Sequence, residues 1–222
     1  SAAAGLHSPM SRWAELNRPP SNLKRWGLRQ HYQITPWTNL VEVHWSKDME
    51  AYVTPVSPNT VGIAVLSHRE LISSWQKPIS LKEALQVFSN LGSKLLSSEA
   101  KDQLIGIGPL HQTVKRTGTG KVVLVGDAAG YLDAITGEGI SNAMEQALLI
   151  DRILKKQKEK PSIDELVFNY ANQLPALMRR YYWLTHLTLL LHRRPSLVNQ
   201  VVRVFQNTRW LFNYLLDLNS AR

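Results

Sequence analysis

The sequence has no cysteine among its 222 residues. This absence excludes disulfide bonds, thiolate-bound zinc or iron–sulfur centres and a thiol nucleophile, and it fits a reducing compartment. No apolar run reaches the length of about 18 residues that a membrane-spanning helix needs. The first residues also lack the basic segment and apolar stretch of a secretory signal. We therefore expect a cytoplasmic protein without a membrane span.

Acidic residues are scarce relative to basic ones, 17 against 26, and the formal net charge is +9. The basic residues are dispersed, and no nucleic-acid-binding module is present, so we expect no nucleic-acid partner. An ordinary solvated surface, or one that steers anionic cofactors, explains the charge. The seven histidines form no H-x-x-x-H pair and no G-x-S-x-G sequence occurs. Neither a metal site nor a hydrolase nucleophile is therefore expected.

The most informative segment is residues 121–147, KVVLVGDAAGYLDAITGEGISNAMEQA. The aliphatic run 122–125 predicts a strand buried on both faces, which Gly126 and Asp127 end. Asp127 then lies at the carboxyl end of a core strand, where α/β sheets bind ligands. Residues 136–139 open a helix with free N–H groups, which predicts an anionic or carbonyl-rich ligand there and a ligand hydroxyl near Asp127. The apolar positions of this helix recur at helical spacing: Ile140, Ala143, Met144, Ala147, Leu148 and Leu154.

This segment resembles the second flavin-binding motif of FAD-dependent monooxygenases of the p-hydroxybenzoate hydroxylase type, in the branch that holds geranylgeranyl reductases and flavin-dependent halogenases. The resemblance implies FAD as the cofactor, with Asp127 of the turn Gly126-Asp127-Ala128 on the ribityl chain. It places a second group of residues against the pyrophosphate and the N1/C2 edge of the flavin: Gly137, Glu138, Gly139 and Ile140. The Glu138 carboxylate is more simply explained as a complement to the helix dipole than as a catalytic acid. No catalytic residue is assigned.

The chain begins SAAAGLHSPMSRWAEL, which resembles an internal motif of the family, usually ADGLHSP, near the pyrophosphates of FAD and NAD(P)H. Gly5 keeps the glycine of that motif, whereas Ala4 stands where the motif has aspartate. The resemblance implies NAD(P)H as the electron donor. The G-x-G-x-x-G unit of the family is absent from the sequence, and the GTGK run at 118–121 precedes its strand, which predicts a tight turn. We expect the C-terminal portion of a larger flavoprotein, or a truncated relative.

These patterns predict an α/β chain, α+β within this fragment: part of a three-layer FAD-binding domain, an inserted and mostly antiparallel substrate sheet, and C-terminal helices. The predicted divisions are 1–22, 23–115, 116–160 and 161–222. The β-rich runs favour pairing by hairpins, and they are 28–35, 40–45, 51–56 and 61–66. A helix at 80–96 and a returning strand at 104–114 follow. A capping box at Ser162 and Glu165 starts a long helix to about residue 192, which Pro175 is expected to kink, and a last helix runs to about residue 218.

The predicted function is that of an FAD-dependent oxidoreductase, a monooxygenase of a small organic substrate with NAD(P)H as reductant. A geranylgeranyl-reductase or halogenase type of flavoenzyme and a non-catalytic scaffold are the alternatives. Strand alternation separates the side chains of residues 41, 43 and 45 from those of residues 42 and 44. One of these two faces must line the flavin, and the pattern does not decide which.

The C-terminal helices are amphipathic and carry apolar clusters at residues 181–183, 187–191 and 210–212. Packing on the FAD domain is the favoured explanation. A lipophilic substrate channel and a peripheral membrane contact are the alternatives.

Overall fold

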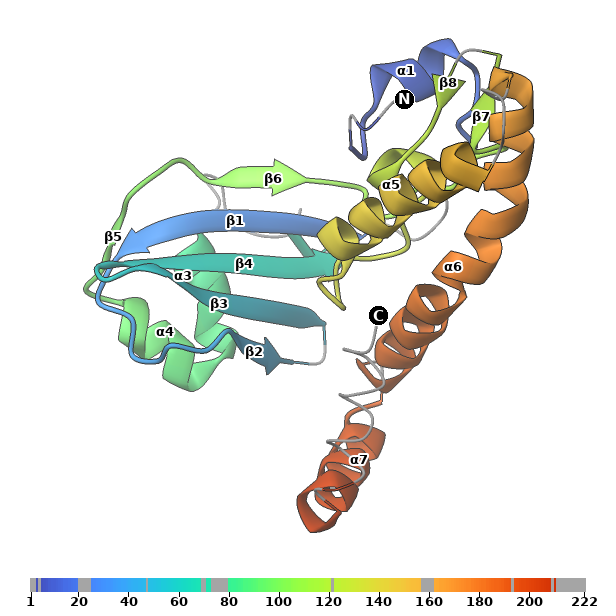
Figure 1. The fold of residues 1–222 in the computed structure, drawn as a ribbon. Coiled ribbons are helices and arrows are strands. Elements are labelled where there is room, and N and C mark those ends of the chain that lie inside the picture. Colours follow the sequence, from blue (N-terminus) through green and yellow to red (C-terminus); the bar gives the residue numbers. More distant parts are fainter. Residues whose placement is uncertain are drawn as a thin grey trace.

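A computed structural model describes most of the chain as a sheet with helices on both of its faces (Figure 1). The described residues are 3, 5–19, 25–46, 48–68, 71–72, 80–120, 122–156, 162–192, 194–208 and 210, so Ala4 lies outside them. Helices and a mostly antiparallel sheet confirm the predicted fold class. The division into four segments stays a prediction.

The large sheet is built around three strands of nine residues: β1 (Arg25–Gln33), β3 (Met49–Ser57) and β4 (Thr60–His68). The order is β2-β3-β4-β1-β5, where β2 is Glu42–Trp45 and β5 is Glu99–Ala100, and β6 (Ile105–Ile107) also pairs with β1. Every pairing is antiparallel. The prediction of successive hairpins is correct for β2-β3-β4 but wrong for β1, which pairs with β4. The short β2 alternates between partly buried and exposed positions, as is usual for an edge strand. The edge of β4 that does not pair with β3 pairs with β1.

One face of this sheet carries an apolar core under α3 (Leu81–Ala84), η1 (Leu85–Val87) and α4 (Ser89–Leu95). The predicted continuous helix over 80–96 is therefore wrong in one respect, because Phe88 has a non-helical backbone between the two parts. Its apolar spacing nevertheless identified buried residues, namely Leu81, Leu85, Phe88, Leu91 and Leu95. The returning strand over 104–114 is limited to β6, and Pro109, which lacks an N–H group, follows it closely.

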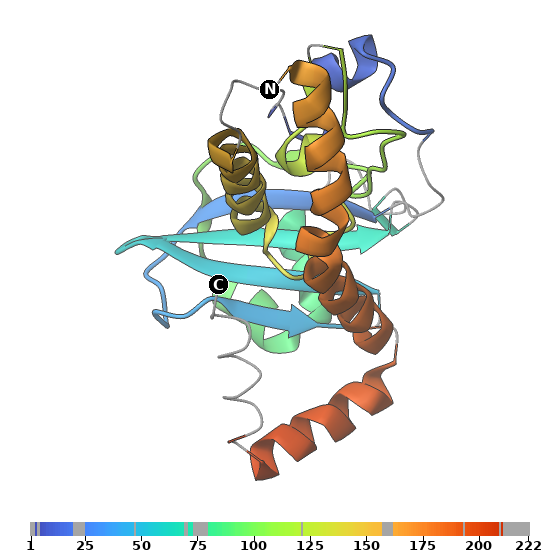
Figure 2. The same cartoon turned by 45° about the vertical axis from the view of Figure 1, so that its right-hand side comes forward.

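The remaining elements lie on the other face of the sheet and beyond its end (Figures 1 and 2). They are α1 (Pro9–Trp13), β7 (Gly118–Thr119), β8 (Val122–Val123), η2 (Gly126–Ala129), α5 (Gly139–Lys156), α6 (Ile163–His192) and α7 (Pro195–Asn207). The antiparallel pair β7-β8 confirms the predicted tight turn. The capping box is also present, since the Glu165 N–H donates to Ser162 Oγ at 3.2 Å and the Ser162 N–H donates to Glu165 Oε2 at 2.9 Å. The long helix predicted to about residue 192 is α6, and the predicted kink at Pro175 stays a prediction. The last helix is predicted to run to about residue 218, but α7 ends at Asn207, and the residues beyond 210 lie outside the described ones.

The apolar side of α5 faces away from the core, whereas a core helix is expected to bury this side. Its predicted apolar stripe is largely exposed: Ile140 is 75%, Met144 63%, Leu148 53% and Leu154 44% exposed. The side that packs on α6 buries Asn142, Gln146, Leu149 and Ile153. An apolar helix face with no partner among the described residues is a candidate contact surface.

Two expected absences concern only the part of the chain that the structure describes. No helix there is long and apolar enough to cross a membrane. No group of three or more potential metal ligands occurs there either.

Candidate functional site

The segment that carries Asp127 is a short 3-10 turn held in place by a buried glutamine. Leu124 and Val125 are buried, and η2 begins at Gly126, whose φ of +66° favours glycine. The Gly126 N–H donates to Gln146 Oε1 at 2.8 Å, and the same oxygen accepts a hydrogen bond from Tyr170 at 3.0 Å. One side chain of α5 therefore joins the turn to α6.

The Asp127 carboxylate makes no hydrogen bond or ion pair with any residue that the structure describes. Burial raises its pKa above the ordinary aspartate value. A Cβ atom added to Gly139 would lie 3.7 Å from Asp127 Oδ1, so the start of α5 passes close to the carboxylate. This half-buried carboxylate can therefore accept a hydrogen bond from water or from a ligand.

A cavity of about 250 Å³ opens beside Asp127. Five of the eight predicted site residues line it: Gly5, Gly126, Asp127, Gly139 and Ile140. Ala3, Val125, Tyr131 and Ala143 complete the wall. The first N–H groups of α5 have no intrahelical partner, because they precede the first full turn. The cavity thus combines a carboxylate, small residues and a helix N-terminus.

The other three predicted residues support this arrangement from outside the cavity wall. Ala128 is fully buried against Leu16 and Leu124. Gly137 has a φ of +69°, which favours glycine, and the Glu138 carbonyl accepts the Asn142 N–H at 2.9 Å as the helix begins. The binding of FAD by all eight residues stays a prediction.

The sheet presents one defined face to this segment. The Tyr52 hydroxyl donates to the Ile135 carbonyl at 3.0 Å. In the register of β2 with β3, Val43 lies opposite Tyr52 and Trp45 opposite Glu50, so these four side chains share a face. The face that meets the segment at Ile135 is therefore the one with Val43 and Trp45, and both of these side chains are exposed, whereas the lining of the flavin by this face stays a prediction.

A buried ionic cluster, which the sequence analysis missed, lies on the same face. Arg25 contacts Glu50 and Asp133 with nitrogen–oxygen distances of 2.9 Å each, and His192 Nδ1 lies 3.3 Å from Glu50 Oε1. The exposed fractions are 7%, 0%, 4% and 11% for Arg25, Glu50, Asp133 and His192. The four residues come from β1, β3, the loop after η2 and the end of α6. They join the three parts of the chain that surround the candidate site.

Burial dominates the electrostatics of this cluster. Loss of solvation raises the pKa of Glu50 and of Asp133, although Arg25 opposes both shifts. Burial, followed by Arg25, lowers the pKa of His192. Arg25 therefore opposes the effect of burial on the two acids and adds to the effect of burial on His192.

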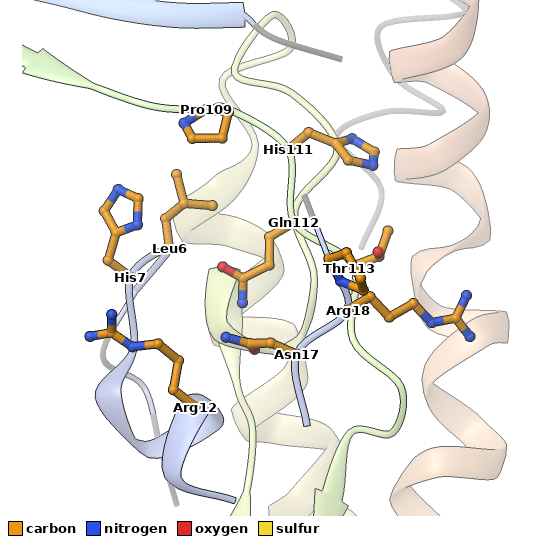
Figure 3. A pocket seen from close by; sticks show the side chains of 10 residues that line it. Leu6, His7, Arg12, Asn17, Arg18, Pro109, His111, Gln112 and Thr113 are labelled. Carbon is orange, nitrogen blue, oxygen red and sulfur yellow. The ribbon is translucent and has the colours of Figure 1, made fainter. Parts of the chain in front are cut away.

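A second cavity, of about 160 Å³, carries basic side chains (Figure 3). It is lined by His7, Arg12, Arg18 and His111, together with Asn17 and other residues. The Asn17 Oδ1 atom is buried without a hydrogen-bond partner among the described residues. Figure 3 shows His7 and Arg12 on one side of this cavity, and His111 and Arg18 extending toward α6 on the other.

The fold around Asp127 is similar to that of solved flavin-dependent proteins. Three solved structures share the fold. The flavin-dependent brominase Bmp2 matches with a TM-score of 0.65 and 15% identity, over 95% of this chain and 62% of that one. A flavoprotein/dehydrogenase from Cytophaga hutchinsonii matches with a TM-score of 0.67 and 16% identity, over 85% of this chain and 47% of that one. PqsL, a probable FAD-dependent monooxygenase from Pseudomonas aeruginosa, matches with a TM-score of 0.55 and 19% identity, over 80% of this chain and 52% of that one. The predicted resemblance is confirmed at the level of the fold.

The chain is also similar to a curated protein, digeranylgeranylglycerophospholipid reductase 2 of Methanococcoides burtonii. The two are 35% identical over 108 residues, which is 48% of this chain and 25% of that protein. No protein-family model matches the chain. The chain thus spans a quarter of the curated relative and about one third to two thirds of the solved structures it resembles.

Proposed function

We propose that this chain forms the flavin-facing and substrate-covering part of an FAD-dependent oxidoreductase. The observation that carries the proposal is the cavity in which Asp127, without a partner among the described residues, lies beside Gly5 and the N-terminus of α5. The flavin-dependent enzymes that share the fold support it. When bound, FAD supplies hydride transfer and oxygen activation.

The residues around Asp127 fit the flavin and ribityl half of FAD. The Asp127 carboxylate accepts a hydrogen bond from a ribityl hydroxyl, and the absence of a Cβ at Gly139 keeps the approach open. The first N–H groups of α5 and the helix dipole stabilise negative charge at the N1/C2 edge, with a contribution of roughly 0.3–2 kcal/mol. The cavity is smaller than most small-molecule sites, and the sequence holds no G-x-G-x-x-G unit for the AMP half.

A dinucleotide-binding unit must therefore complete the site in the working protein. We propose that it packs on the exposed stripe of α5, formed by Ile140, Met144, Leu148 and Leu154. This stripe begins beside the cavity, since Ile140 belongs to both. A unit placed there brings its phosphate-binding turn next to the first N–H groups of α5.

The substrate lies between the flavin and the sheet, against the face that carries Val43, Trp45 and Tyr52. The exposed apolar side chains of this face favour an organic substrate with an apolar part, and the chain orients it and excludes water. We propose oxygen-dependent hydroxylation of a small organic substrate as the reaction. Reduction of an isoprenoid double bond is the second candidate, and the 35% identity to a digeranylgeranylglycerophospholipid reductase favours it. Oxygen consumption during turnover separates the two.

NAD(P)H is the proposed electron donor, and the basic cavity of Figure 3 is its proposed seat. His7 and Arg12 lie two and seven residues after Gly5, which lines the Asp127 cavity. The guanidinium groups of Arg12 and Arg18, which line this cavity, favour an anionic ligand such as a pyrophosphate. The net charge of +9 favours the approach of such a ligand.

The test is FAD titration, followed by flavin fluorescence, of a polypeptide that carries a G-x-G-x-x-G unit ahead of this chain. Asp127→Asn weakens FAD binding about tenfold or more, because a hydrogen bond to a charged group contributes roughly 1.5–3 kcal/mol. The wild-type affinity also falls as the pH drops through the raised pKa of Asp127, because protonation removes the charged acceptor. Asp151→Asn is the matched control on the exposed side of α5. Equal affinities of the two variants, with an intact fold, contradict the assignment of Asp127.

A further inference from the structure

We propose that the chain has a further ligand site, for a small amphiphile with an anionic head, between α6 and the segment that follows Asp127. The site is a cavity of about 320 Å³. This volume falls in the range of about 300–1,000 Å³ that is typical of small-molecule sites. The proposal does not depend on the binding of a flavin.

The inner part of the cavity is apolar. Ala129 and Leu132 line it from the segment after Asp127, and Leu174 and Met178 line it from α6. All four side chains are buried. A ligand that reaches this part needs an apolar body, because a polar one would lose its hydration without a hydrogen-bond partner.

Two side chains that line this cavity, Arg18 and Thr117, have hydrogen-bonding groups without a partner among the described residues. The Arg18 guanidinium makes no ion pair or hydrogen bond with the described residues, and Thr117 Oγ1 is buried without a partner among them. The His111 ring is fixed at the wall by the contact of its Nδ1 with the Leu132 carbonyl at 3.2 Å. Figure 3 shows both Arg18 and His111 extending toward α6. A cation beside two further polar groups selects an anionic head such as a carboxylate.

This cavity adjoins the basic cavity, with which it shares Arg18, His111, Gln112 and Thr113, so an anionic head here uses the same Arg18 as a ligand of the basic cavity. Asp127, Gly139 and Ile140 line only the flavin cavity, whereas His7 and Arg12 line only the basic one. Thr117, Leu174 and Met178 belong to the new cavity alone among these three. Tyr131 lines both the new cavity and the flavin cavity, so an occupant contacts the wall of the flavin site from behind.

The volume suggests a suitable probe. At about 30 Å³ per water molecule the cavity holds the equivalent of on the order of ten waters, which corresponds to a ligand of on the order of ten non-hydrogen atoms. Phenylbutyrate has this size, an apolar body and one carboxylate. Phenylbutyramide is its uncharged counterpart.

The experiment is calorimetric titration of the 222-residue chain with each probe. We expect phenylbutyrate to bind, the amide to bind roughly tenfold more weakly or worse, and Arg18→Gln to weaken phenylbutyrate binding by a similar factor. Arg179→Gln makes the same charge change on an exposed part of α6 outside the cavity, and it should leave binding unchanged. Thr113→Trp, at an exposed position on the rim, should block both probes.

Three outcomes overturn the proposal. The first is a dissociation constant of the wild-type chain weaker than about 1 mM for phenylbutyrate. The second is equal binding of acid and amide, which shows that no anionic head is recognised. The third is an equal effect of Arg18→Gln and Arg179→Gln, which assigns the attraction to the net charge of the chain and not to this cavity.

Discussion

Arg25→Met tests whether the buried ionic cluster holds the sheet, the loop after η2 and α6 together. The substitution keeps most of the aliphatic volume and removes the cation between Glu50 and Asp133. These two carboxyls are 0% and 4% exposed, so water cannot replace the lost partner. Removal of one partner from a buried ion pair destabilises a protein by about 3–5 kcal/mol. At roughly 2–4 °C per kcal/mol for a chain of this length, the melting temperature should fall by roughly 6–20 °C.

The pH dependence of this loss has a definite sign. A carboxyl whose pKa is raised on folding favours the folded state below its unfolded pKa, and this contribution is lost as the pH rises through the folded value. Burial raises the pKa of both Glu50 and Asp133, and Arg25 is the group that most opposes the rise. Without Arg25 both pKa values rise further. The difference in unfolding free energy between wild type and variant should therefore be larger at about pH 8 than at about pH 5.

The assay is urea unfolding of both proteins across this pH range, followed by circular dichroism. Arg29→Met is the matched control, since it lies on the same strand and its side chain is 48% exposed with an ion pair to Asp102 at 3.5 Å. It should change the unfolding free energy little, because solvent screens such a pair. If Arg25→Met behaves like Arg29→Met, or if its effect does not grow with pH, the cluster does not join these segments as argued.

Two further predictions concern α5 and α6. Met144→Glu together with Leu148→Lys on the exposed stripe of α5 should lower the binding of a hydrophobic dye to the chain and abolish its association with a dinucleotide-binding unit. Val87→Glu, at an equally exposed apolar position on η1, is the control and should lower dye binding only. Association that survives the α5 changes contradicts the proposed contact. Ser162→Ala should lower the unfolding free energy by about 0.5–2 kcal/mol, since it removes the acceptor of the Glu165 N–H at the start of α6. Glu165→Gln should lower the unfolding free energy less, because the glutamine can still accept from the Ser162 N–H. Denaturant unfolding that ranks the two variants the other way argues against the capping box.

Local signals explain what was predictable from the sequence. The turn at Gly126 and the start of α5 at Gly139 each depend on residues a few positions apart, whereas only Val122 and Val123 of the strand predicted at 122–125 form a strand, β8, which pairs antiparallel with β7. The capping box at Ser162 is of the same kind. The burial of Leu81 and Leu91 also followed from helical spacing, even though the backbone between them is not one helix. In each case the determining contacts lie within one or two turns of chain.

Long-range pairing explains what was not predictable. Arg25, Glu50, Asp133 and His192 are separated by tens of residues and belong to no local motif, so only the tertiary structure brings them together. The pairing of β1 with β4 depends in the same way on which strand occupies the edge. The periodicity of α5 correctly indicated an amphipathic helix. It does not specify the partner, and the described residues cover the opposite side, with Asn142 and Gln146.

The orientation of the sheet links these observations to the candidate site. Alternation along β2 and β3 defines two faces, and the hydrogen bond from Tyr52 to the Ile135 carbonyl selects the one that meets the segment between Asp127 and α5. Glu50 lies two residues before Tyr52 on that face, and Asp133 lies two residues before Ile135 on that segment. The ionic cluster and the Tyr52 hydrogen bond therefore hold the same two surfaces together at neighbouring points. Because the proposed substrate space is bounded by these surfaces, its width depends on Arg25, a residue that lines neither the flavin cavity nor the basic one.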